Sequence, residues 1–282
     1  MSGFNFGGLE PPFSDYKKAK FAVLPVPYER TTSYVQGTAY GPAAIIEASA
    51  NMELYDEELD FTPAESGIAT FEDLVIDAPP EEMVDIVDEH IARILQDRKI
   101  PVMLGGEHSI TVGAVQAVRR RHPGVSVLQL DAHTDLRDEY EGSRYNHACV
   151  MARVREMAPC VQAGIRSSCA EEAECLKKFG DTIFHARRIL KDRNLSEIVG
   201  SLSDEVYITL DLDVFDPSIM PSVGTPEPGG LGWYDVLELL ERVCAEKTVV
   251  GFDVVELCPN PQSVASDFTA AKIAYKLMGL RI

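Results

Sequence analysis

Short apolar runs alternate with amphipathic segments along nearly the whole chain. The runs are rich in Val, Ile and Leu and show no regular polar position, which is typical of strands buried on both faces of a parallel sheet. Seven strands are predicted: Phe21–Val26, Ile100–Leu104, Val125–Leu130, Val161–Ile165, Thr182–His185, Val206–Leu210 and Val249–Val254.

The segments between these runs have the period of a helix. Glu82–Gln96 places Met83, Val87 and Ile91 on one stripe, and its early acids suit the helix dipole. Strands that alternate with helices predict one α/β domain, residues 1–282, around a central parallel sheet. The other predicted helices are Pro42–Ser49, Ser109–Arg121, His147–Met157, Ala170–Phe179, Trp233–Ala245 and Ser263–Leu280.

Polar clusters follow four of the predicted strands. In an open α/β sheet the chemistry lies beyond the carboxyl ends of the strands, so these clusters predict a single functional site. The clusters are GGEHSI at 105–110, DAHTD at 131–135, DLD at 211–213 and DVVE at 253–256.

The same clusters favour a metal site. Alternate residues of an extended segment point to one side, which groups the acids and the histidine of DAHTD and the two acids of DLD. His108, from GGEHSI, joins them if its strand is a neighbour. The predicted ligands are His108, Asp131, His133, Asp135, Asp211 and Asp213.

Charge and ligand type favour two divalent ions in this site. Four converging carboxylates repel one another unless cations are present, and two divalent ions carry the matching charge. Mostly oxygen ligands with two imidazoles favour Mn²⁺, with Fe²⁺, Co²⁺ or Zn²⁺ as alternatives. Such a pair lowers the pKa of a bridging water toward neutrality and so supplies hydroxide as a nucleophile.

Composition limits the possible partners. The 282 residues carry a formal net charge of −19, which argues against nucleic acid or an anionic membrane and permits a cationic substrate. No apolar run is long enough to span a membrane and no secretory signal is visible, so we expect a cytoplasmic protein. The six cysteines have no metal-type spacing and are expected to be reduced packing residues.

Three motifs, GGEHSI, DAHTDL and DLDVFDPSIMPSVGTPEPGG, together resemble the signatures of the ureohydrolases, the arginase and agmatinase family. TTSYVQGTAYGPAAIIEAS and DVVELCP are similar to the family's N-terminal segment and last strand, so the resemblance extends over nearly the whole chain. It implies a three-layer αβα sandwich around a mostly parallel eight-stranded sheet, as in the arginase/deacetylase-like fold. It also implies two Mn²⁺ per subunit on the six predicted ligands, and a homo-oligomer, either a trimer or a hexamer.

The resemblance also implies roles for three other residues. His147, in NHACVM, falls where the family has a histidine that shuttles protons, and Glu256 falls where a carboxylate grips the guanidinium. Thr225 is similar to a threonine beside the site. The implied reaction is hydrolysis of a guanidinium group to urea, with hydroxide as the nucleophile.

The segment LRDEYEGSRYN, at 136–146, bears on the choice of substrate. Its three acids would repel a substrate α-carboxylate and attract a terminal ammonium group, and the segment resembles that of agmatinases. We therefore predict hydrolysis of agmatine to urea and putrescine, with Asp138 binding the substrate. Arg137 and Arg144 lie in the same stretch, and the alternative is that the acids face solvent.

Other functions stay open. Thr209 stands where many family members have serine, a change that keeps the hydroxyl. NPQSVASDFTA after Pro259 lacks a Tyr–Asp pair often found in agmatinases, so N1-aminopropylagmatine, guanidinobutyrate or arginine are alternative substrates. A non-catalytic family member acting through partners is a further alternative. DLDVFD at 211–216 superficially matches a phosphatase nucleophile motif, but it lies late in the chain and leaves DAHTD unexplained.

Overall fold

A single eight-stranded sheet forms the centre of the computed structural model, which describes residues 5–282. Neighbouring strands are parallel throughout, in the order β2-β1-β3-β8-β7-β4-β5-β6. The strands are β1 Phe21–Val26, β2 Ile68–Thr70, β3 Ile100–Gly105, β4 Ser126–Leu130, β5 Cys160–Ile165, β6 Ile183–His185, β7 Glu205–Asp211 and β8 Thr248–Val255.

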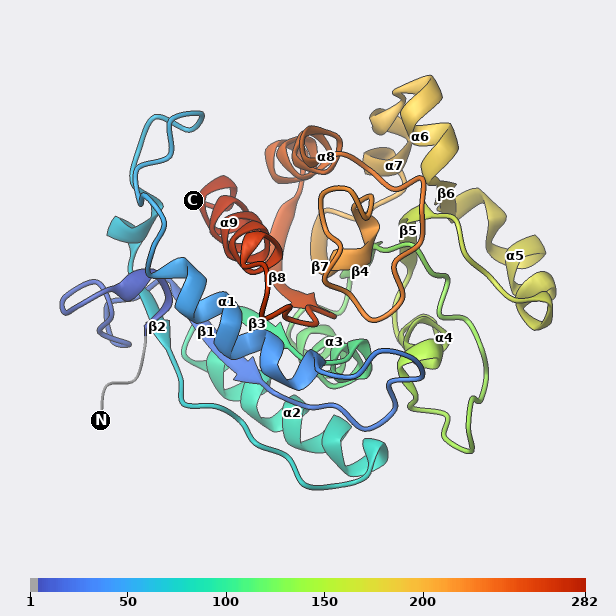
Figure 1. Ribbon diagram of the computed structural model, residues 1–282, viewed down its shortest axis with the longest axis horizontal. Helices are drawn as coiled ribbons and strands as arrows, with labels where there is room; N and C mark the ends of the chain where they lie inside the picture. The colour runs from blue at the N-terminus through green and yellow to red at the C-terminus, as the bar shows by residue number, and fades with distance from the viewer. Residues whose placement is uncertain (1–4) are drawn as a thin grey trace.

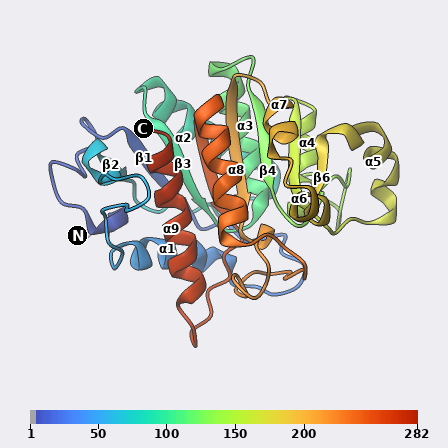
Figure 2. The same ribbon diagram turned by 90° about the horizontal axis from the view of Figure 1, so that it is seen from above.

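Helices cover both faces of this sheet and make three layers (Figures 1 and 2). One face carries α1 (Gly41–Ser49), α6 (Ala186–Asp192), α7 (Leu195–Gly200), α8 (Trp233–Glu246) and α9 (Ala265–Leu280). The opposite face carries α2 (Pro80–Gln96), α3 (Thr111–Arg121), α4 (Val150–Arg155) and α5 (Ala173–Phe179). The predicted αβα sandwich is confirmed, with a sheet that is parallel throughout.

The two faces of the sheet belong to two separate cores. In β1, Phe21 and Val23 pack into the core under α1 and α9, whereas Ala22 and Leu24 pack into the core under α2 and α3. Successive side chains of a strand point to opposite faces, so a strand covered on both faces is apolar at every position. This burial explains the continuous apolar runs in the sequence.

All seven predicted strands are present, but three short elements were not predicted. Strand β2 has only three residues and pairs with β1 at the edge of the sheet. Helices α6 and α7 have seven and six residues, too few to show a helical period. None of the helices in residues 5–282 is long and apolar enough to cross a membrane.

The order of the strands determines where the site lies. Strands β7 and β8 lie between β3 and β4, so four central neighbours are β3, β8, β7 and β4. Because these strands are parallel, their carboxyl ends meet at one edge of the sheet. The four polar clusters of the sequence lie at or just beyond the carboxyl ends of these same four strands, and therefore side by side.

Candidate active site

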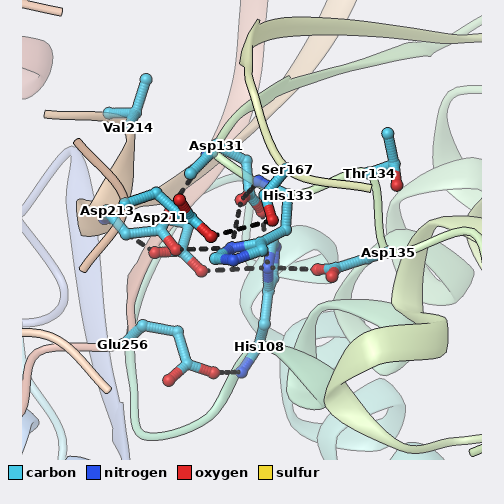
Figure 3. A network of polar contacts seen from close by, with 12 residues as sticks. His108, Asp131, His133, Thr134, Asp135, Ser167, Asp211, Asp213, Val214 and Glu256 are labelled. Carbon is cyan, nitrogen blue, oxygen red and sulfur yellow. Dashed lines mark hydrogen bonds and ion pairs between the residues drawn. The ribbon is translucent and has the colours of Figure 1, made fainter. Parts of the chain in front are cut away.

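All six predicted metal ligands meet at this edge of the sheet (Figure 3). His108 lies in a short 3₁₀ turn after β3, and the DAHTD residues follow β4 directly. Asp211 ends β7, and the 3₁₀ turn that follows carries Asp213. Glu256 follows β8, so each central strand contributes to the cluster.

The first group of ligand atoms surrounds His108. Its Nδ1 atom lies 3.2 Å from Asp131 Oδ2, 3.3 Å from Asp135 Oδ2 and 3.4 Å from Asp211 Oδ2. The histidine and Asp131 are fully buried. Ligand atoms of His108, Asp131 and Asp135 all lie within 4.8 Å of one another, and this set of one nitrogen and two carboxylate oxygens suits a metal ion.

The second group surrounds His133 and shares Asp131 with the first. His133 Nδ1 lies 2.8 Å from Asp213 Oδ2 and 3.6 Å from Asp131 Oδ1. Asp131 therefore turns one carboxylate oxygen toward each histidine. Two adjacent clusters with a common carboxylate are the arrangement that a pair of metal ions requires.

The charge of this site is unfavourable without cations. Burial, together with the charge of Asp131, raises the pKa of the Asp135 carboxyl to about 6. Burial and the charges of Asp213 and Asp131 raise the pKa of Asp211 well above its usual range. Divalent cations would remove this repulsion and keep the carboxylates ionised.

The second ring nitrogen of His108 has a fixed partner. His108 Nε2 lies 2.8 Å from Thr209 Oγ1, and the Thr209 hydroxyl donates to Asp253 Oδ1 at 2.6 Å. The single hydroxyl proton is used on Asp253, so Nε2 must donate its own proton to Thr209. This arrangement keeps the Nδ1 lone pair available on the side of the carboxylates.

That lone pair provides a test of whether the residues fit a metal. His108 Nδ1 is buried and has no hydrogen-bond partner among the described residues. Burial lowers the pKa of His108, but the three neighbouring carboxylates raise it well above its ordinary value. The three carboxylates therefore favour a positive charge at His108 Nδ1. A metal cation bound to this atom would supply that charge, so the residues fit a metal.

Two residues of the site have left-handed backbone conformations that side chains rarely adopt. The φ angles are +48° at Asp135 and +67° at Glu256. Each such residue costs on the order of 1 kcal/mol, which surrounding contacts must offset. Glu256 Oε1 accepts a hydrogen bond of 2.6 Å from the His108 N–H, which holds the carboxylate beside the cluster.

The clusters open into a pocket of about 300 Å³. His147, Glu256 and Thr225, the three other residues singled out by the resemblance, all contribute to its lining. Thr32 and Ser33, from the loop after β1, line it as well. Eight of the ten predicted residues therefore line one cavity, and the buried Asp131 lies behind it between His108 and His133.

Asp138 is the exception, because among the described residues it neither lines the pocket nor pairs with a residue of the two clusters. Its side chain is 80% exposed, and its Oδ1 accepts from Arg153 at 2.6 Å and from Arg144 at 3.0 Å. These arginines neutralise the charge that was expected to attract the substrate. The geometry therefore does not support a substrate contact for Asp138.

Several supporting residues were not predicted from the sequence. Gln129 Nε2 donates to Asp131 Oδ2 at 2.6 Å, and Asp253 anchors Thr209 behind His108. The Arg166 guanidinium donates to the backbone carbonyl of Asp213 at 2.6 Å and so fixes the turn after β7. A polar residue inside an otherwise apolar strand, as at Gln129 and Asp253, could have indicated such a supporting residue. A buried polar group needs a hydrogen-bond partner.

Comparison with known proteins gives a consistent assignment. Residues 19–279 match the arginase family. The chain is 44% identical over 276 residues to the N(1)-aminopropylagmatine ureohydrolase of Synechocystis sp., covering 94% of this chain and 90% of that protein. It is 38% identical over 275 residues to the agmatinase of Pyrococcus horikoshii, covering 96% of this chain and 95% of that protein.

A solved structure agrees with these sequence relatives. The agmatine ureohydrolase of Thermoplasma volcanium is similar with a TM-score of 0.89 and 34% identity, over 100% of this chain and 95% of that chain. The fold, the buried metal-type clusters and the relatives all lead to the same assignment. The chain belongs to the arginase family and is a ureohydrolase, a hydrolase that acts on guanidino compounds.

Proposed function

We propose that this protein is a binuclear manganese enzyme that hydrolyses agmatine to urea and putrescine. The observation that supports this most strongly is the pair of clusters that share Asp131. They lie in one pocket with a carboxylate, Glu256, and a histidine, His147. A guanidinium carbon is a poor electrophile, because its cation is delocalised, so the reaction needs a strong nucleophile beside a group that holds the cation.

The metals would be held by the six clustered residues. Two divalent cations match the four carboxylate charges, and the oxygen-rich ligand set with two imidazoles favours Mn²⁺. When bound, the metals supply an activated water as the nucleophile at neutral pH. The ligands in this proposal are His108, Asp131, His133, Asp135, Asp211 and Asp213.

Glu256 would bind the guanidinium group. Its Oε1 accepts from the His108 N–H, and its Oε2 accepts no hydrogen bond from any residue in 5–282. Burial raises the pKa of Glu256 to about 8, so a nearby cation would favour the ionised form. A charge-assisted hydrogen bond from the planar guanidinium would then hold the reacting carbon in place, with Thr225 on the same lining.

His147 would move the protons. Burial lowers its pKa below the ordinary value, so the imidazole is neutral at pH 7 and able to accept a proton. It could then donate that proton to the leaving amine, which departs as putrescine. The products balance with one water molecule consumed for each agmatine.

The substrate tail would lie toward the mouth of the pocket. Besides the clustered acids and Glu256, the lining includes Glu172, which is buried and accepts from the backbone N–H groups of Leu136 and Cys169. Glu172 has no ion pair with any other described residue, so its charge favours a cationic tail. The likeness to an agmatinase and to an agmatine ureohydrolase supports agmatine.

N1-aminopropylagmatine is the second candidate substrate. The Synechocystis relative named for this compound is more similar in sequence than the agmatinase relative. The two compounds share the guanidinium end and differ in the length of the cationic tail, so the metal chemistry is the same for both. The choice between the two substrates therefore depends only on the length of cationic tail that fits in the mouth of the pocket.

The test is urea release from agmatine, N1-aminopropylagmatine, arginine and guanidinobutyrate by protein preincubated with Mn²⁺. Preference for agmatine would support the proposal, and preference for its aminopropyl derivative would support the second candidate. Preference for arginine or guanidinobutyrate would show that the mouth does not select a cationic tail. Release of no urea from any of the four would contradict the proposed reaction.

A further inference from the structure

Beside His147 lies a buried carboxylate that the proposed reaction does not use. Glu107, in the turn after β3, is fully buried. It accepts from the backbone N–H groups of Arg30 and Thr31, both at 2.6 Å. It also accepts from the hydroxyl of Thr31 at 2.8 Å and from that of Ser109 at 2.5 Å. Glu107 therefore fixes the loop after β1 beside the pocket, with the Thr31 side chain in one orientation.

The Thr31 hydroxyl joins Glu107 to His147. Thr31 Oγ1 accepts from the His147 backbone N–H at 2.9 Å and lies 3.2 Å from His147 Nδ1. A hydroxyl has one proton, and the Glu107 carboxylate, which is the closer and stronger acceptor, takes it. His147 Nδ1 must then carry a proton and donate it to Thr31, since two lone pairs would otherwise face each other.

The remaining ring nitrogen is thereby left as the base. His147 Nε2 lies 3.4 Å from the hydroxyl oxygen of Ser33, which lines the pocket. The protonation of one histidine nitrogen is set by the hydrogen bond that the other nitrogen makes. A proton acceptor is useful only if its lone pair is on the side of the reacting groups.

We propose that Glu107 and Thr31 are positioning residues for His147, which they hold as the tautomer protonated at Nδ1, so that Nε2 accepts protons from the pocket. This inference rests on the proposed role of His147 in guanidine hydrolysis. It assigns functions to two residues outside the predicted metal ligands. Both act through His147 and need not touch the substrate.

The test compares Thr31→Val with Thr31→Ser. Valine has the same shape without the hydroxyl, whereas serine retains it. We expect Thr31→Val to lower kcat about tenfold, a part of the usual contribution of a general base. KM and bound Mn²⁺ should stay unchanged, and Thr31→Ser should keep most of the turnover.

A double-mutant cycle separates positioning from a general structural effect. If Thr31 acts through His147, Thr31→Val should cost nothing further when added to His147→Ala. An equal loss in both backgrounds would overturn the inference, as would wild-type turnover in Thr31→Val. In either case wild-type urea release would leave the proposed function intact.

A second measurement is independent of activity. In ¹⁵N-histidine-labelled protein loaded with diamagnetic Zn²⁺, NMR reports which nitrogen of each neutral imidazole carries the proton, and His147→Gln identifies the signal. We expect a protonated Nδ1 in the wild type and in Thr31→Ser, and a shift toward protonated Nε2 in Thr31→Val. A wild-type His147 protonated at Nε2 would overturn the inference even if the protein releases no urea from any guanidine.

Discussion

Asp131 is the residue on which both halves of the proposed metal centre depend, since each of its oxygens faces a different histidine. We expect Asp131→Ala to lose bound metal and to abolish urea release. Metal content by mass spectrometry and turnover can be measured on the same samples. The control is Asp192→Asn, which changes an acid paired with Arg188 on the surface of α6. Retained turnover with full metal content in Asp131→Ala would refute its role as a ligand.

Thr209 is a second residue on which metal binding is expected to depend, because its hydroxyl links His108 to Asp253. Loss of a group that orients a metal-bound histidine typically weakens metal affinity by about 10- to 100-fold. Thr209→Val should show this loss in a competition titration with a chelator, whereas Thr209→Ser should not. Equal affinity in both variants would show that the hydroxyl does not orient His108.

Four polar side chains on neighbouring strands form a row across the middle of the sheet. The register places each member opposite the next on neighbouring strands β5, β4, β7 and β8, and all are fully buried. The row lies nearer the middle of the strands than the predicted ligands do. Two of its members contact predicted ligands directly: Gln129 contacts Asp131, and Thr209 contacts His108. It consists of Gln162, Gln129, Thr209 and Asp253.

Some of these features could be predicted from the sequence and others could not. Strand positions and the polar clusters at their ends were predictable, because apolar runs and clustered acids are local patterns. Neither the register that pairs Thr209 with Asp253 nor the packing of α4 that brings Arg153 to Asp138 is local. For this reason the sequence indicated which acids and histidines cluster, whereas the supporting row and the partners of Asp138 were not predicted.

The turn after β3 packs closely against the end of β1 at Gly106. A Cβ atom on Gly106 would lie 2.1 Å from the backbone oxygen of Tyr28, so the turn after β3 and the end of β1 could not keep their present contact. Gly106→Ala should therefore destabilise the fold by about 1–3 kcal/mol and displace Glu107 and His108. Denaturant unfolding measures the loss.

The matched control for this substitution is Gly124→Ala, because a Cβ at Gly124 meets no atom within 4 Å. We expect its free energy of unfolding to stay close to that of the wild type. If Gly106→Ala were as stable as Gly124→Ala, the close approach of the two turns would not be required by the fold.

For the whole molecule, strands from both halves of the chain contribute to the site. The fold class and the family were predictable, because motifs far apart in the sequence follow strands that become neighbours. Three short elements were not: β2 pairs through only three residues, and α6 and α7 are too short to show a period. Their stability depends on packing against the sheet, which a local pattern does not report.

The buried charges predict how the stability of the whole molecule depends on pH. Without metal, burial raises the pKa of Glu256 to about 8 and that of Asp135 to about 6, from ordinary values of about 4. A carboxyl whose pKa is higher in the folded chain destabilises the fold as the pH rises through that interval, here roughly pH 4 to 8.

A histidine of the site changes stability in the same direction. The carboxylates of Asp213 and Asp131 raise the pKa of His133 to about 12, although burial lowers it, so the stabilisation from its proton is lost as the pH rises above about 6.5. Metal binding requires the deprotonated ligands. The rise in Tm on adding Mn²⁺ should therefore grow from pH 5 to pH 8, and a constant rise would contradict this account.

The most direct test of the central claim is a titration of metal-free protein with Mn²⁺, in which bound metal per chain and urea release from agmatine are measured in the same samples. We expect no urea release without metal, and full turnover when two Mn²⁺ are bound per chain. Urea release by the metal-free protein, or two bound ions without hydrolysis of agmatine or any other guanidine, would contradict it.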